Sequence, residues 1–292
     1  SEAMVKAVKE AEKKVKAPKL YDLTTLQREA NRIYGMTAKQ TLDTAQSLYE
    51  KKLITYPRTD SQYLTEDMEQ TARNVVRQIY EKYQLTGPFD QPEQPDVKKV
   101  MNNSKVTDHH AIIPTMELSS CHLDELKSWE EKILFLIAVH TVMAMSKDHI
   151  YQETEIEVEC QGEIFKAKGR TVLQDGWKLF ENCFKNKDRM AIVDPDQEMK
   201  ERMPKVTQGQ TFYAVAAEKT EHFTSPPKPY SEDTLLAAME TAGNKEFDED
   251  TEKKGLGTPA TRAGIIEKLI YSQYATRKGK QIIPTDLSLI HI

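Results

Sequence analysis

The chain has 292 residues, more than one ordinary hydrophobic core needs, so its length predicts two or three domains. Hydrophobic residues make up 38% and charged residues 30% of the chain, a composition typical of a soluble globular protein, and no apolar run approaches the roughly 18 residues that a membrane span requires. The net charge of −5 argues mildly against a nucleic acid partner, but basic residues exceed acidic ones over residues 1–60, so charge leaves that question open.

Cysteine usage and the two ends of the chain indicate its setting. The three cysteines are widely separated and lack the spacing of a metal site, which is typical of reduced thiols in a cytoplasmic protein. The Lys/Glu-rich start has no apolar segment of the kind found in a signal peptide. The arbitrary-looking start and the stop after an apolar stretch at 287–292 indicate a fragment, in which residues 1–16 would be a tail or a truncated lead-in.

Capping signals predict helices in the first part of the chain. A capping box at Thr24 opens a helix that Gly35 ends, and a second box at Thr37 opens a helix that runs to about Lys52. A third helix is capped by Thr65 and has acidic residues in its first turn. We therefore expect a helical domain at this end of the molecule.

The pattern changes along the rest of the chain. Residues 85–105 are rich in proline and polar groups and predict a loop, whereas Leu123–Met145 predicts one or two buried helices. Residues 150–222 contain alternating apolar and charged positions, which predict a β-rich module. A stiff proline-rich connector at 225–229 then leads into a final helical part that begins at Ser231.

The segment 53–61 reads LITYPRTDS and is the most informative for chemistry. Pro57 disfavours helical backbone at Tyr56, so the phenol is presented from an extended link, and Arg58 points to the same side. A phenol ordinarily ionises near pH 10 and needs help to attack phosphorus, which a neighbouring guanidinium can supply while binding the phosphate. Taken alone, a surface tyrosine beside an ion-paired arginine is the simpler interpretation.

Two further segments could contact an anion. Residues 108–115 read DHHAIIPT; adjacent histidines are usually solvated, and a metal site would need a third ligand that is not adjacent. Residues 255–263 read GLGTPATRA, in which two glycines let the backbone approach a ligand, Thr258 caps a helix and Pro259 takes its first position. That helix start can bind phosphate or be an ordinary glycine–proline start.

Together these segments resemble the type IA DNA topoisomerases, in particular the topoisomerase III branch. LITYPRTDS is similar to the family's active-site signature ITYxRTDS, and DHHAIIPT to its HxAIxPT element about fifty residues later. GLGTPATRA resembles the GIGxPxT motif, with Thr258 and Arg262 where the topoisomerase I form has arginine and tyrosine. The run PPKPYSE at 226–232 resembles PPxRYSE, but Pro229 replaces the usual arginine, so no DNA contact is carried over to it.

The resemblance implies a role for each matching residue. Tyr56 would attack a single-stranded DNA phosphodiester and form a 5′-phosphotyrosine link, with Arg58 and His109 as the other catalytic residues. Ser231 would contact phosphate or simply cap its helix, two alternatives that stay open. The residues expected to bind DNA are His110, Asp60, Ser231, Gly257, Thr258, Thr261 and Arg262.

The resemblance also implies an α+β multidomain fold. Residues 17–147 would form the helical gate domain with the active-site tyrosine (domain III), 148–224 part of the β-rich arch (domain II), and 225–292 part of the helical base (domain IV). The whole enzyme would cut one strand, pass another and reseal without ATP. We expect a monomer that binds single-stranded DNA through its phosphate backbone and has no membrane association.

The same resemblance places Mg²⁺, expected as the cofactor of the full enzyme, on a toprim domain that this sequence lacks. Asp194–Glu198 and Asp248–Glu252 have a similar acidic pattern, but neither continues as the toprim motif does, so solvated turns are the better interpretation. No metal ligand is therefore expected in this chain, and the chain alone is expected not to relax DNA. The alternative is a non-catalytic single-stranded DNA-binding module.

Overall fold

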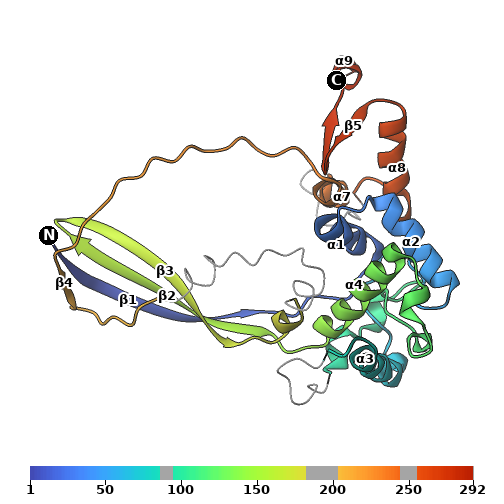
Figure 1. Ribbon diagram of the computed structural model, residues 1–292, viewed down its shortest axis with the longest axis horizontal. Helices are drawn as coiled ribbons and strands as arrows, with labels where there is room; N and C mark the ends of the chain where they lie inside the picture. The colour runs from blue at the N-terminus through green and yellow to red at the C-terminus, as the bar shows by residue number, and fades with distance from the viewer. Residues whose placement is uncertain (86–94, 182–202, 244–254, 292) are drawn as a thin grey trace. The chain divides into compact units, whose positions relative to one another are not determined.

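The computed structural model describes residues 1–85, 95–181, 203–243 and 255–291 (Figure 1). The chain divides into two compact units, residues 1–17 with 146–226 and residues 18–145 with 227–292. The mixture of helices and sheets over more than one unit confirms the predicted α+β multidomain class. The two acidic segments noted above lie outside the described residues.

The first unit is built on a four-stranded antiparallel sheet with the order β3-β2-β1-β4 (Figure 1). Its strands are β1 (Glu2–Val15), β2 (His149–Cys160), β3 (Glu163–Gln174) and β4 (Thr211–Tyr213). Gln161 and Gly162, both at positive φ, form the tight turn between β2 and β3 that matches the right-handed twist of the strands. The last strand, β4, is short, and Ala214 directly after it turns the chain with a φ of 57°.

The first strand corrects one prediction. Residues 1–16 were expected to be a tail or lead-in, yet residues 2–15 form an inner strand of this sheet. Lysines of β1 and β3 lie beside the glutamates of β2, so the charged alternation becomes a cross-strand ladder. The ion pairs are Lys6–Glu159, Lys9–Glu157, Lys166–Glu157 and Lys168–Glu155.

The second unit contains the predicted helices. They are α1 (Leu23–Tyr34), α2 (Ala38–Glu50), α3 (Glu69–Tyr83) and α4 (Ser128–Ala144). Helix α4 is buried on all sides over most of its length and forms the centre of the core. Short 3-10 turns connect these helices at Glu66–Met68, Val97–Val100, Asn103–Lys105, Met116–Leu118 and Leu123–Glu125.

The helix caps follow the sequence closely. The capping box at Thr37 is formed with Gln40, and Gly35 ends α1 with a φ of 70°. The predicted N-cap of α1, Thr24, is wrong by two residues. The N-cap is Asp22, whose side chain accepts a hydrogen bond from the backbone N–H of Thr25. An aspartate preceding a threonine run competes well for this position.

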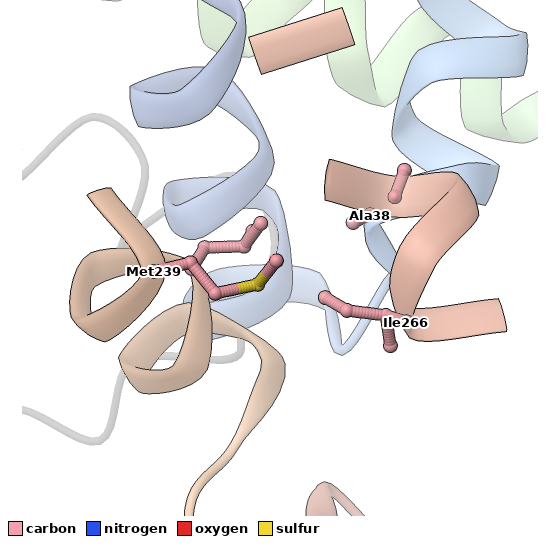
Figure 2. Close-up of a cluster of buried hydrophobic side chains, with 5 residues drawn as sticks. Ala38, Met239 and Ile266 are labelled. Carbon is pink, nitrogen blue, oxygen red and sulfur yellow. The ribbon is translucent and has the colours of Figure 1, made fainter. Parts of the chain in front are cut away.

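The C-terminal part packs on the same unit. It contains α7 (Glu232–Thr241), α8 (Pro259–Tyr271), the hairpin of β5 (Ala275–Lys278) and β6 (Gln281–Pro284), and α9 (Asp286–His291). A hydrophobic cluster joins α7 and α8 to the first residue of α2 (Figure 2). Its buried members are Ala38, Leu236, Met239, Ala263 and Ile266.

Candidate active site around Tyr56

The two motifs singled out in the sequence lie side by side in the second unit. The backbone N–H of Thr55 donates to Ile113 O at 3.0 Å, and the N–H of Thr115 donates to Leu53 O at 3.0 Å. The Thr55 hydroxyl accepts from the Ile113 N–H at 3.0 Å and donates to Ala111 O at 2.9 Å. Thr55 therefore links the segment before Tyr56 to the segment after the two histidines through hydrogen bonds.

The second half of the tyrosine motif, residues 59–61, also forms hydrogen bonds with the histidine segment and the residues before it. The Thr59 hydroxyl donates to His109 O at 2.9 Å and accepts from the Ser61 N–H at 3.1 Å. The Ser61 hydroxyl donates to Lys105 O at 2.8 Å. Both side chains are buried, so these hydrogen bonds are shielded from water and fix the loop. No role for Thr55, Thr59 or Ser61 is predicted from the sequence.

This scaffold brings the ring of Tyr56 against that of His109. Their centroids are 4.3 Å apart, and the ring planes are inclined at 41°. The ring of Tyr49 also contacts Tyr56, with its centroid 5.4 Å from that of Tyr56 and its plane at 78°. Tyr56 is half-buried and His109 is exposed, so the phenol lies at the surface beside a group that can carry a proton or bind an anion.

The other polar groups of the motifs are at the surface. Arg58 and Asp60 are exposed, and neither forms a hydrogen bond or ion pair with another described residue. The simpler interpretation, in which Arg58 forms an ion pair, therefore does not hold among the described residues. His110 is half-buried, and its Nδ1 lies 2.9 Å from Ala111 O.

A buried aromatic pair supports the backbone next to this site. Tyr21 stacks on His140 with centroids 3.7 Å apart, and its hydroxyl donates to Glu29 at 2.6 Å. Burial raises the pKa of Tyr21 well above its usual value and lowers that of His140, so both rings are neutral at pH 7. Tyr21 O accepts from the Ile112 N–H at 2.8 Å, which links the pair to the histidine segment.

The C-terminal motif forms the start of α8. Thr258 and Thr261 form a capping box, and Gly257 has a φ of 68°. Because a Cβ on Gly257 would lie 2.9 Å from Ile265 Cδ1, only glycine fits this turn without rearrangement. Ser231 caps α7 by accepting from the Thr234 N–H at 3.3 Å, which is one of the two roles expected of it.

Arg262 differs from its predicted place. Its side chain is buried, and its guanidinium donates to Leu256 O at 3.1 Å, to Gly257 O at 3.3 Å and to Thr24 Oγ1 at 2.9 Å. The expected direct contact with DNA is therefore not available in this structure. The carbonyls of Leu256 and Gly257 need hydrogen-bond donors, and the buried guanidinium of Arg262 supplies them.

The described residues also bear on metal binding and membranes. Over residues 1–85, 95–181, 203–243 and 255–291, no group of three or more His, Cys, Asp or Glu side chains could hold a metal ion. The same ranges contain no helix long and apolar enough to cross a bilayer.

Comparison with known proteins identifies the family. A family model described as DNA topoisomerase matches residues 1–290. The chain belongs to the DNA topoisomerase family. It is 38% identical to DNA topoisomerase 3 of Bacillus licheniformis over 97% of the chain and 39% of that protein, and 38% identical to the protein of the same name from Bacillus subtilis over 97% and 40%. The chain thus spans about two fifths of these relatives.

A solved structure agrees with this assignment at the level of the fold. The structure of full-length topoisomerase I from Thermotoga maritima superposes with a TM-score of 0.70 at 24% identity, covering 98% of this chain and 43% of that one. The resemblance to type IA topoisomerases, drawn from four short segments, is confirmed by these findings. The predicted topoisomerase-like fold is confirmed with it.

Proposed function

We propose that this chain is the tyrosine-bearing part of a type IA topoisomerase of the topoisomerase III kind. The observation that supports it most directly is the pairing of the two motifs, which places the Tyr56 ring 4.3 Å from His109 at the surface of the second unit. By the resemblance, residues 17–147 would be the gate, 148–224 part of the arch and 225–292 part of the base. The whole enzyme would cut one DNA strand, pass another through the break and reseal it.

The proposed cleavage is a transesterification. Tyr56 Oη loses its proton and attacks the phosphorus, the bond from phosphorus to the 3′ oxygen breaks, and that oxygen gains a proton and leaves as a 3′-hydroxyl. The 5′ phosphate stays on Tyr56 as an ester, so resealing is the reverse attack by the 3′-hydroxyl and needs no ATP. Arg58, exposed and close to the tyrosine in sequence, would bind the phosphate and balance its developing charge, with His109 on the other side.

The strand would be held by its backbone at several points. The N-terminus of α8, with Gly257, Thr258 and Thr261, offers backbone N–H groups and a favourable dipole to a phosphate. His110, Asp60 and Ser231 remain proposed contacts with the strand. Arg262 would act indirectly, because it holds the glycine turn from within.

Mg²⁺ is proposed only for a longer enzyme. By the resemblance, the metal would be bound by a toprim domain outside this chain, and no step above uses it. The chain by itself is therefore predicted not to relax supercoiled DNA, since catalytic groups that act as a unit lose most of their effect when separated. A cytoplasmic location and a monomeric state are also proposed.

The test is a covalent-adduct assay. Single-stranded DNA labelled at its 3′ end is mixed with the chain and Mg²⁺, and the products are separated on a denaturing gel beside those of Tyr56→Phe. The expected result is a weak labelled protein band from the unmutated chain alone, because one cleavage needs far less activity than repeated relaxation. With the label at the 5′ end, a shortened free strand is expected instead. Binding without any adduct would favour the alternative, a non-catalytic single-stranded DNA-binding module. An adduct with the opposite polarity would contradict the proposed chemistry.

A further inference from the structure

Tyr49 has an unusual place beside the nucleophile. It lies in the last turn of α2, and its ring approaches that of Tyr56 nearly at a right angle, with centroids 5.4 Å apart. This edge-on contact covers only part of the ring, because Tyr49 remains 39% exposed. The side chain thus packs against Tyr56 and still presents aromatic surface to solvent.

A fixed turn holds Tyr49 in this position. Lys52 adopts a left-handed φ of 62°, and its N–H donates to Tyr49 O at 2.8 Å, while the Leu53 N–H donates to Leu48 O at 2.9 Å. On the far side of the turn, the Thr115 hydroxyl donates to Lys52 O. The chain therefore reverses over a hydrogen-bonded turn, and the two rings are brought together by backbone geometry rather than by a mobile loop.

The charged residues close to Tyr49 and Tyr56 in the sequence suit a nucleic acid strand. Lys52 and Arg58, on either side of Tyr56 in the sequence, are exposed. Sites for single-stranded nucleic acid combine cations that bind the phosphates with aromatic rings on which the bases stack. In duplex DNA each nucleotide of a strand advances about 3.4 Å along the helix axis, so a ring 5.4 Å from the Tyr56 ring is on the length scale of one or two nucleotides from the one that is cut.

We propose that Tyr49 is a nucleobase-stacking residue that binds the base of a nucleotide adjacent to the scissile phosphate. This inference rests on the proposed function, since it needs a DNA strand at Tyr56. Every base has an aromatic face, so the contact would add affinity without strong sequence preference. The competing explanation is that Tyr49 only covers the edge of Tyr56, in which case its effect would not depend on the bases.

A binding experiment separates the two explanations. All proteins carry Tyr56→Phe, so that binding is reversible, and their affinities are measured by fluorescence anisotropy for two strands of about twelve nucleotides, a site size usual for such domains. One strand is oligothymidylate, and the other has the same phosphates with abasic sugars throughout. Tyr49→Leu removes the aromatic face but keeps an apolar cover, Tyr49→Trp keeps the face, and Tyr213→Leu changes an exposed tyrosine of β4 as a control.

The expected result is that Tyr49→Leu weakens binding of oligothymidylate by roughly 5- to 150-fold and leaves binding of the abasic strand unchanged. Tyr49→Trp and Tyr213→Leu should bind both strands like the parent, and the salt dependence should be unaltered in all of them. Equal losses on both strands, or no loss on either, would overturn the stacking role while leaving the proposed function intact. Failure of the parent to bind either strand would overturn both. Thermal unfolding of each variant checks that Tyr49→Leu is folded.

Discussion

The hydroxyl of Thr55 is the group whose removal should loosen the candidate site most selectively. It accepts from the Ile113 N–H and donates to Ala111 O, and both of those residues are fully buried. Thr55→Val keeps the shape of the side chain but leaves the Ile113 N–H without a partner. Two lost hydrogen bonds at about 1 kcal/mol each, plus the desolvation of a buried donor, give about 2–4 kcal/mol of destabilisation.

The matched variant is Thr55→Ser, which keeps the hydroxyl and loses one methyl group, a change of about 1 kcal/mol or less. Unfolding in urea can be followed for the second unit alone, because the chain has two tryptophans and Trp177→Phe leaves Trp129 in α4 as the reporter. The adduct assay should rank the proteins in the same order as their stability. A Thr55→Val protein within about 0.5 kcal/mol of the parent, or a Thr55→Ser protein as unstable as Thr55→Val, would refute the reasoning.

Three further changes test other parts of the second unit. Arg262→Leu should destabilise it by about 2–4 kcal/mol in the same urea assay, because two carbonyls of the glycine turn lose their donor. Burial raises the pKa of Glu130, but hydrogen bonds from Lys51, Ser47 and the Lys127 N–H outweigh this and lower it to about 2. Its contribution, up to about 3 kcal/mol, should be complete above pH 4.5 and be lost as the pH falls towards 2, and Glu130→Gln should lack that part of the pH dependence. Gly257→Ala should cost about 1–2 kcal/mol and weaken oligonucleotide binding, whereas Gly264→Ala, inside α8 with open space at its Cβ, should stabilise by about 0.5–1 kcal/mol in thermal unfolding.

Local features of this fold could be predicted from the sequence because their partners are three or four residues apart. The capping box at Thr37, the glycine that ends α1 and the proline at the first position of α8 are all such cases. Strand β1 was not predicted, because its apolar and charged residues do not alternate regularly and its partner is far along the chain, with Val5 pairing with Val158. The β5–β6 hairpin was not predicted, because its two short strands show no clear alternation of apolar and polar residues.

The candidate site also has features that could be predicted from the sequence and features that could not. The pairing of the tyrosine and histidine motifs followed from the family resemblance, since nothing local relates residues about fifty positions apart. The burial of Arg262 could not be foreseen, because the Thr24 hydroxyl that it contacts lies in a different helix, 238 residues away in the sequence. Tyr49 was overlooked because its relation to Tyr56 depends on the left-handed turn at Lys52, a conformation that lysine seldom adopts.

The charge of the molecule illustrates why bulk properties left DNA binding open. A net charge of −5 would repel a polyanion if it were spread evenly. In the first unit, however, the glutamates of β2 lie against lysines of the neighbouring strands, so their charges are largely compensated within the sheet. Near Tyr56, Lys52 and Arg58 are exposed and form no ion pair with another described residue. At physiological salt the field of a charge fades within about 8 Å, so a strand at Tyr56 responds to these cations rather than to the total.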